Sequence, residues 1–475
     1  MWYVVGFAAG FLTVLVLRAL LFNPRPQRKI DDTPVTFDAD AAVSNLQKLV
    51  QCKTISYNDP ALEDDGEFQK LIDLLPHLYP NVFAACSFQQ LPDRALLFCW
   101  KGKSHQNPSV MMAHYDVVPV REDLWEKPPF AGIIEDGVLW GRGTLDTKVT
   151  LNGALFAANE LIGKGFVPEN DVYFAFSGGE EVNGLGAVNI VNWFAEHHIT
   201  PAMVVDEGGA VVENVFPGVK VPCGMVGIGE KGMMNVRYTV HSGGGHASAP
   251  PVKTPLTTLA TACRRIVEHP FKMRVNKAAG LMFDTLARHS TFLYKLIFAN
   301  LRLFRPVLDL ICKTSGGEMN ALVRTTTAFT QASGSSARNV IPAEASLVSN
   351  MRLSPADSVA SATAYLKKIV ADDSVEIEVL ESFEPSPLSE TDCDSYYKVA
   401  DAVAETWRGC VVTPYLMVQC SDSRHYRDLC DKVYKFSAMD LTSEERKTIH
   451  GNNERIRLET IGKAVEFYIR LLTKC

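Results

Sequence analysis

The chain has 475 residues, of which 47% are hydrophobic, and its formal net charge is −7. That length exceeds what one compact core usually holds, so two domains are expected. The acidic balance argues against nucleic acid as a partner, because such binding depends on Lys and Arg side chains that neutralise phosphates. The 11 cysteines include no Cys-x-x-Cys pair, which is untypical of a disulfide framework or a thiolate metal site.

The N-terminal segment has the composition of a membrane anchor. Residues 2–22 are almost wholly apolar and contain one charge, Arg18, and about 20 such residues cross a bilayer as a helix. Basic residues follow the apolar run, between 25 and 29, whereas a cleaved signal peptide begins with them. We therefore expect an uncleaved single-pass helix over 1–23 and a linker over 24–37. The side of the membrane stays open, because large domains are exported against a positive-inside bias.

Residues 38–231 alternate short apolar runs with helical patterns, which is typical of an open α/β sheet. We expect this segment to be the first part of a catalytic domain and residues 382–475, which again mix strand and helix patterns, to complete it. The predicted buried strands are 96–100, 110–113, 172–176 and 203–205, and the predicted helices are 147–163 and 183–198.

A second domain is predicted over residues 232–381. The order of its elements is strand, helix, two strands, helix and strand, a βαββαβ pattern typical of an α+β domain. Inside it, residues 280–312 are unusually apolar. By itself such a segment more often belongs to a protein core than to a lipid site.

Three predicted strands of the first domain end in residue types that bind metals. His114 and Asp116 follow one strand, Glu180 and Glu181 follow another, and Asp206 follows a third. Because the carboxyl ends of strands in an open α/β sheet meet at one edge, where ligands bind, these side chains can meet in space. Each acid alone is as easily a surface residue or a helix cap, but the three strand ends together predict a metal site.

Imidazole and carboxylate are the zinc ligands expected when thiolates are absent, and a two-metal site needs a carboxylate that bridges the ions. Asp146 is the bridging candidate, since it ends a glycine-containing turn, residues 141–146, just before a predicted helix. Aspartate at that place is also a common helix N-cap, and the local sequence alone favours the cap over the bridge. Asp116 would accept the second N–H of the His114 imidazole and so fix its orientation.

The adjacent acids Glu180 and Glu181 suit a division of labour in hydrolysis. One binds metal, while the other takes a proton from water and returns it to the leaving amine. Near the C-terminus stands an isolated His450. A lone histidine is more often structural than a ligand, and its position alone does not decide between the two.

Taken in order, these residues resemble the aminoacylase and carboxypeptidase family of co-catalytic zinc exopeptidases, from about residue 40 to the C-terminus. The family pattern is His-x-Asp, Gly-Arg-Gly followed by Asp, Glu-Glu, Asp or Glu, a glycine-rich lid segment and a C-terminal His, and each part is present. The resemblance implies a mixed-sheet catalytic domain with an inserted lid domain, and two zinc ions per chain. It assigns His114 and Asp206 to one zinc, Glu181 and His450 to the other, Asp146 as the bridge and Glu180 as the catalytic acid/base.

The resemblance also implies three functional residues in the lid. His246 would stabilise the oxyanion that forms from the substrate carbonyl, and Asn339 is the matching asparagine. Arg352 would hold a substrate carboxylate through its planar fork of donors, although a surface ion pair is the alternative role for this arginine. The family's lid often pairs two subunits and delivers its histidine across the interface, so a homodimer is one expectation.

Within the family, the sequence is most similar to the carboxypeptidase S and N-fatty-acyl-amino-acid synthase/hydrolase branch. The segments AHYDVVPV, VDEGGA, HASAPP and SDSRHY carry this likeness, and the anchor and the apolar 280–312 segment agree with it. Two positions depart from the family pattern: Thr147 stands where an acid commonly follows the bridging aspartate, and Gly179 where aspartate is usual. Neither is a ligand position, so they affect rate or tuning more than metal binding.

The resemblance implies hydrolysis of an amide bond next to a free carboxylate, in a small-molecule substrate. An N-acyl amino acid, with a fatty acyl chain favoured, is one substrate class, and a short peptide cut at its C-terminal end is the other. Reversal to synthesis is compatible with the same site. A different class of function, an inactive protein that binds an amino-acid conjugate, is disfavoured by the complete set of metal ligands and by Glu180.

Overall fold

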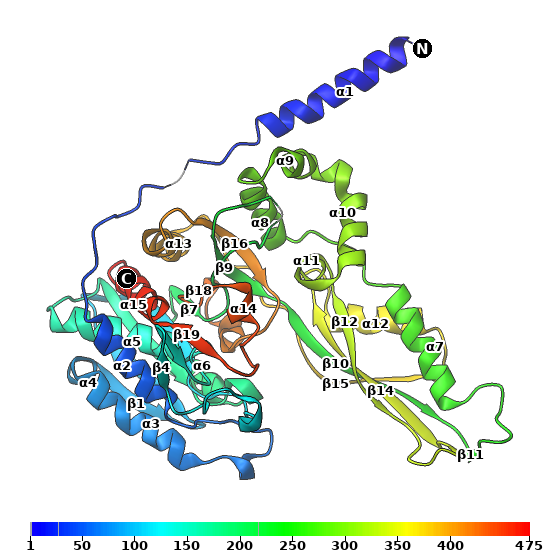
Figure 1. Cartoon of the computed structure of the whole chain (residues 1–475), viewed down its shortest axis with the longest axis horizontal. Coiled ribbons are helices and arrows are strands. Elements are labelled where there is room, and N and C mark those ends of the chain that lie inside the picture. Colours follow the sequence, from blue (N-terminus) through cyan, green and yellow to red (C-terminus); the bar gives the residue numbers. More distant parts are fainter. Residues whose placement is uncertain (1, 27, 217) are drawn as a thin grey trace.

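The computed structural model describes residues 2–26, 28–216 and 218–475. Figure 1 shows a large α/β body that contains the C-terminus, and an elongated second domain, the proposed lid, that extends from it. Helix α1 (Trp2–Leu20) projects from the body near α9 (Phe292–Ala299).

A mixed sheet of ten strands organises the large body. Nine strands run in the order β1 (Ser87–Leu91), β2 (Ala95–Trp100), β6 (Asn170–Ser177), β3 (Ser104–His114), β7 (Met203–Asp206), β17 (Val433–Lys435), β9 (Cys223–Glu230), β8 (Val211–Val212) and β18 (Asp440–Leu441), while β16 (Val411–Met417) pairs with β9. The strands β6, β3, β7 and β17 are parallel neighbours, whereas β2 pairs with β6 in the antiparallel sense. The expected α/β fold with a mixed sheet is thus confirmed.

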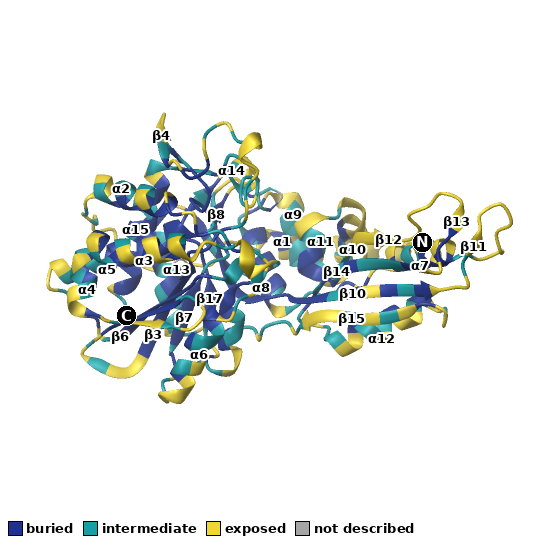
Figure 2. Ribbon diagram, turned by 90° about the horizontal axis from the view of Figure 1, so that it is seen from below, coloured by how far each residue is buried: buried dark blue, intermediate teal, exposed yellow. Residues whose placement is uncertain are grey.

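The side chains of each strand point alternately to the two faces of the sheet, so the core has two layers. In β2, Leu96 and Phe98 belong to one apolar cluster, whereas Leu97 and Cys99 belong to the cluster on the opposite face, as a period of two requires. The larger cluster includes residues of the body helices α2 (Ala39–Val50), α3 (Asp65–Leu78), α4 (Pro80–Ala85), α5 (Lys148–Gly163), α13 (Asp394–Thr406) and α15 (Leu458–Leu472), and helices of the insert described below add to it. The smaller cluster is covered by α6 (Gly186–Glu196). Figure 2 shows the buried strands at the centre of the body.

The helices predicted at 147–163 and 183–198 are present as α5 and α6. Helix α6 begins three residues later than expected, because residue Asn183 takes the left-handed conformation, with a φ of 55°, which an α-helix does not accommodate. The chain between β6 and α6 forms instead the short 3-10 helix η3 (Glu180–Val182). This departure matters for the site, because it leaves the two adjacent glutamates on an irregular turn.

The lid is built on a four-stranded sheet of order β12 (Thr326–Ser333), β14 (Glu344–Leu353), β10 (Gly232–His241) and β15 (Glu376–Phe383). Helices α7 (Pro255–Glu268) and α12 (Val359–Val370) pack on this sheet and share its separate apolar cluster. At the far end, the short strands β11 (Gly245–His246) and β13 (Val340–Ile341) form a two-stranded tip. We keep 232–381 as the proposed bounds of the lid domain.

The unusually apolar segment 280–312 lies between α7 and β12. It covers most of α8 (Lys277–Arg288), all of α9 and most of α10 (Leu301–Ser315), and α11 (Gly317–Val323) follows it. Buried residues of α8, α10 and α11 belong to the core cluster of the large body and not to that of the lid. This part of the insert therefore packs on the catalytic body, beside β16 and β9.

Candidate metal centre

The predicted ligands come from five places in the chain that the fold brings to one edge of the large sheet. His114 ends β3, η3 supplies Glu180 and Glu181, and Asp206 ends β7. Asp146 stands at the end of the turn before α5. His450 follows α14 (Ser443–Arg446) in a C-terminal loop.

Asp146 lies between the two histidines. Its Oδ1 is 3.0 Å from Nε2 of His114, and its Oδ2 is 3.0 Å from Nε2 of His450. The N-cap position of α5 is Thr147, whose side chain makes no capping hydrogen bond. Asp146 is therefore not the N-cap residue, and its two carboxylate oxygens would be free to bind metal. On the far side, His450 Nε2 is also 3.0 Å from Oε2 of Glu181.

At one predicted ligand position the geometry favours a neighbouring residue. Oε1 of Glu207 lies 3.5 Å from Nε2 of His114. Consecutive side chains at the end of a strand point to opposite sides, and Oδ2 of the buried Asp206 accepts a hydrogen bond from the Ser423 N–H at 2.9 Å. We propose Glu207 in place of the predicted Asp206 as the metal ligand beside His114.

Asp116 takes the orienting place that its spacing from His114 predicts. The Nδ1 atom of His114 lies 3.0 Å from the backbone carbonyl oxygen of Asp116 and 3.4 Å from its carboxylate. The same carboxylate accepts the backbone N–H groups of Glu180 at 3.1 Å and Glu181 at 3.2 Å. Asp116 thus ties the end of β3 to the turn that carries both glutamates.

The electrostatics of the cluster indicate a place for cations. Burial raises the pKa of Glu180 well above its ordinary value, and it raises the pKa of Glu207 to about 8, with the Asp146 charge acting in the same direction. Hydrogen bonds to Asp146 and then Glu181 raise the pKa of His450 to about 10. A raised pKa means that the group keeps its proton, because the proton offsets the negative charge of the neighbouring carboxylates. A bound cation offsets that charge in the same way in a carboxylate-rich site.

The donor set fits a pair of divalent ions. Atoms of His114, Asp146 and Glu181 lie within 4.8 Å of one another, and so do atoms of His114, Glu180 and Glu207. Oε1 of Glu181 is buried and has no hydrogen-bond partner among the described residues, although such an atom normally has one. Neutral imidazoles and carboxylates in this arrangement suit zinc.

The assignment of Glu207 leads to a direct test. We expect Glu207→Gln to weaken metal binding by about 100-fold or more, since even outer-shell changes cost about 10–100-fold. Asp206→Asn should keep both metals and lower only the thermal stability, because it changes the partner of the Ser423 N–H. Metal content by mass spectrometry after dialysis distinguishes the two variants. Loss of metal from Asp206→Asn alone would restore Asp206 as the ligand.

Glu454 is a further residue of the centre, and sequence analysis missed it. This fully buried carboxylate accepts hydrogen bonds from the backbone N–H groups of Gly143, Leu145 and Asp146 at 3.1, 2.7 and 3.2 Å. It also accepts one from Nη1 of Arg142 at 2.6 Å. Glu454 therefore holds the turn that presents Asp146. Its partner Leu145 lies 309 residues away in sequence, so no local pattern reveals it.

The same contacts position His450. Arg142 donates through Nη2 to the carbonyl oxygen of Gly451 at 2.7 Å, next to His450, whose φ is 57°. A residue other than glycine rarely adopts this conformation unless surrounding structure holds it. Arg142 and Glu454 thus connect the Asp146 turn with the His450 loop.

The lid residues are placed differently from the ligands. His246 and Asn339 lie exposed at the tip of the lid, far from the metal centre (Figure 1), where the Ala247 N–H donates to the Asn339 carbonyl oxygen at 2.9 Å. The sheet of the lid carries β11 away from the body in this structure. Arg352 on β14 lies nearer, with Nη1 3.0 Å from Sγ of Cys420.

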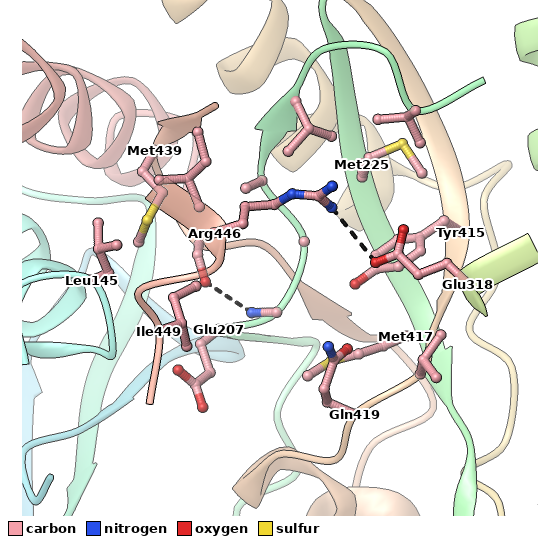
Figure 3. Close-up of a pocket in the computed structure, with 18 of the residues that line it drawn as sticks. Leu145, Glu207, Met225, Glu318, Tyr415, Met417, Gln419, Met439, Arg446 and Ile449 are labelled. Atoms are coloured by element: carbon pink, nitrogen blue, oxygen red, sulfur yellow. Dashed lines mark hydrogen bonds and ion pairs between the residues drawn. The ribbon is translucent and has the colours of Figure 1, made fainter. Parts of the chain in front are cut away.

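A cavity of about 600 Å³ opens beside the metal centre, and Asp146, Glu180, Glu207 and His450 are part of its wall. Glu180 therefore faces the cavity, while Glu181 is bound to His450. Figure 3 shows Glu207 at one side of the cavity, with a Glu318–Arg446 ion pair at another. The remaining wall is mainly apolar.

Comparison with known proteins agrees with this geometry. Residues 110–474 match the model of the peptidase family M20/M25/M40. The N-fatty-acyl-amino acid synthase/hydrolase PM20D1 of Xenopus tropicalis is 35% identical over 441 residues, 90% of this chain and 85% of the relative. A carboxypeptidase S-like protein of Dictyostelium discoideum is 31% identical over 477 residues, 98% of this chain and 92% of the relative.

Solved structures share the fold at low identity. The metallo-carboxypeptidase Sso-CP2 of Sulfolobus solfataricus superposes with a TM-score of 0.66 at 18% identity, covering 91% of this chain and 98% of that one. Human carnosine dipeptidase 1 gives a TM-score of 0.65 at 13% identity, covering 92% and 96%. The chain belongs to the M20/M25/M40 peptidase family. It is a metal-dependent hydrolase of amide bonds, which confirms the resemblance seen in the sequence.

Proposed function

We propose that this hydrolase carries two zinc ions and cleaves N-acyl amino acids whose acyl chain is long and apolar. The cavity beside the metal centre carries this proposal. Its volume of about 600 Å³ lies within the range of about 300–1,000 Å³ that is usual for small-molecule sites. An apolar cavity that opens onto the reacting groups suits a hydrocarbon chain better than a peptide backbone, which needs hydrogen-bond partners.

Methionine is the most frequent apolar side chain in the wall of this cavity. Methionine is unbranched and polarisable, so several together form a surface that adapts to chains of different length and unsaturation. The methionines are contributed by strands and loops of the body and by the helices of the insert: Met225, Met282, Met319, Met417 and Met439. The other apolar and aromatic residues of the wall are Leu145, Ala210, Val212, Val215, Leu322, Tyr415, Val418, Leu441 and Ile449.

Each reacting group has a proposed role. Bound zinc would polarise the scissile carbonyl and lower the pKa of water towards neutrality. Glu180, which faces the cavity, would take the proton of the attacking water and return it to the leaving amine. Arg352 would hold the carboxylate of the amino acid as its planar counter-ion. The reverse reaction, amide formation, would use the same groups in the opposite order.

The relatives support two substrate classes, and one comparison decides between them. We expect kcat/KM for a long-chain N-acyl amino acid to exceed that for an N-blocked dipeptide by about 100-fold, because each buried CH₂ contributes about 0.8 kcal/mol. Met319→Glu should lower kcat/KM for the long-chain N-acyl amino acid. Hydrolysis of a short-chain substrate, an N-acetyl amino acid, should stay unchanged, since only a long acyl chain would reach Met319. Preferential cleavage of the dipeptide would instead assign a carboxypeptidase S-like activity.

In a homodimer, each chain would supply the residue that stabilises the oxyanion at the active site of its partner. We propose that His246 reaches the site of the partner subunit, because it lies at the tip of the lid away from its own centre. His246→Asn should lower activity by about 100–1,000-fold.

Mixing that variant with Glu180→Gln tests the exchange. Each chain then lacks a different group, and a dimer with one copy of each has one complete site. Activity should return to about a quarter of the wild-type value after subunit exchange. Absence of recovery in a mixture shown to contain mixed dimers would place His246 outside the reaction.

We also propose that α1 anchors the chain in a membrane. This helix is long and apolar enough to cross a bilayer, and only 6% of its most apolar stretch is buried. A signal sequence has the same composition, but the basic residues follow the apolar run here.

A further inference from the structure

Helix α10 carries apolar residues on two faces. Leu308 and Cys312 point into the core. Leu303, Val307 and Leu310, spaced by four and three residues and thus on one side of the helix, are exposed by 49%, 49% and 62%. A helix that only covers a protein core would have polar residues on this second face.

The preceding helix extends this exposed face. Phe292 and Leu293 of α9 are exposed by 48% and 62%, and Ile311 of α10 by 50%. We call the set of six the α9–α10 apolar surface: Phe292, Leu293, Leu303, Val307, Leu310 and Ile311. Exposed cations, Arg302 and Lys313, flank it on α10. An apolar stripe bordered by basic residues is typical of helices that lie in a membrane interface.

The apolar helix α1 is attached beside this surface. The two buried residues of α1, Leu15 and Ala19, lie in its C-terminal half, and Nδ2 of Asn300, between α9 and α10, donates to the carbonyl oxygen of Leu15 at 3.2 Å. Figure 1 shows α1 leaving the body next to α9.

The residues after α1 are held on α8. The guanidinium of Arg288 lies 4.2 Å from the centre of the Phe22 ring and donates to the carbonyl oxygen of Asn23 at 2.9 Å. Arg25 pairs with Asp284 of the same helix at 2.7 Å. The end of the apolar helix therefore has a defined place on the body, and α9 and α10 are its neighbours.

We propose that the α9–α10 apolar surface lies in the interface of the bilayer that α1 crosses. This inference rests on the proposed anchor. A bilayer is favoured as the occupant because the surface adjoins the membrane helix and because its flanking cations match anionic headgroups. Burial in the interface would remove six large apolar side chains from water, each a favourable transfer.

The proposed docking has a consequence for the substrate. Helices α8 and α11, which precede and follow α9 and α10, contribute Met282, Met319 and Leu322 to the apolar cavity. The two helices that carry the surface are thus adjacent in sequence to two helices that line the cavity. Long-chain substrates would enter from the membrane, where they are concentrated, while short-chain substrates would enter from water.

The full chain in nanodiscs of phosphatidylcholine and phosphatidylserine tests the contact directly. Leu310→Trp places a fluorophore on the surface, and lipids brominated in their acyl chains quench it only within the bilayer. Val267→Trp on α7 is the matched control, since Val267 is exposed by 64% and Leu310 by 62%. After subtraction of the wild-type signal, we expect quenching of Leu310→Trp and not of the control. Phe292→Trp gives an independent second position.

Equal quenching of both variants, or none at either α9–α10 position, would overturn the proposal. A second copy of the chain on this surface would give protection from the lipid quencher together with a larger oligomer, and would also overturn it. The functional arm uses Leu303→Glu with Leu310→Glu. The apparent KM for a long-chain N-acyl amino acid dissolved in the nanodisc should rise about tenfold, with the kinetics of the soluble N-acetyl substrate unchanged. An unchanged long-chain KM would contradict entry from the membrane.

Failure of the proposed function gives a different result. If the wild-type chain does not hydrolyse long-chain substrates, the substrate proposal falls, while the quenching still reports whether the surface lies in the bilayer.

Discussion

Glu180→Gln is expected to lower turnover by about 10²–10⁴-fold, the usual contribution of general acid–base catalysis, while the metal content stays at the wild-type level. The reason is the position of Glu180 in the wall of the cavity, where we propose that its carboxylate meets the substrate, while Glu181 pairs with His450. Glutamine keeps the shape of the side chain and loses the ability to carry the proton. Single-turnover rates and metal analysis of the same preparation measure the two properties together.

The adjacent glutamate is the matched control for this variant. Glu181→Gln makes the same chemical change one residue away, and it should lose metal together with activity because it removes a partner of His450. A Glu180→Gln protein that lost its metal would instead make Glu180 a ligand. One that kept the wild-type rate would remove it from the reaction.

Glu454→Ala is expected to destabilise the chain by about 3–5 kcal/mol, the usual result of removing one partner from a buried ion pair. The variant leaves the Arg142 guanidinium buried without its carboxylate and three backbone N–H groups without an acceptor. Because Asp146 belongs to the turn that loses its support, metal affinity should fall as well. The thermal unfolding midpoint, measured with and without added zinc, tests both effects.

Glu444→Ala is the control for this prediction. Glu444 belongs to the same C-terminal region, and it pairs with Lys447 at 2.7 Å, but its side chain is exposed by 76%. An exposed pair of this kind contributes about 0–1 kcal/mol, so the midpoint should hardly change. Equal midpoints for the two alanine variants would show that Glu454 does not support the metal centre.

Local patterns predicted much of the fold. The strands that became β2, β6, β3 and β7 were recognisable because their residues are apolar on both faces, as buried strands require. The start of α6 was not recognisable, because it depends on the left-handed conformation of Asn183, the residue after η3. The apolar 280–312 segment showed no alternation that separates core from surface. In the structure this segment contributes to both the core and the surface, since Leu308 is buried and Leu310 is exposed.

Sequence by itself determined the chemical class of the site. His114, Asp116 and the Glu180–Glu181 pair follow predicted strands, and strand ends in an α/β sheet meet at one edge. The apolar N-terminal helix was equally clear from composition. These features depend on residues close together in the chain, so their pattern is visible without a structure.

Only the tertiary structure decided between the remaining alternatives. It showed Asp146 between two histidines that lie far apart in sequence, and it placed the Glu207 carboxylate beside His114, on which our proposal of Glu207 as a ligand rests. It also revealed Glu454 and carried His246 away from its own centre. These outcomes depend on contacts between distant segments and on which side of the backbone a residue points, and neither is encoded in local periodicity.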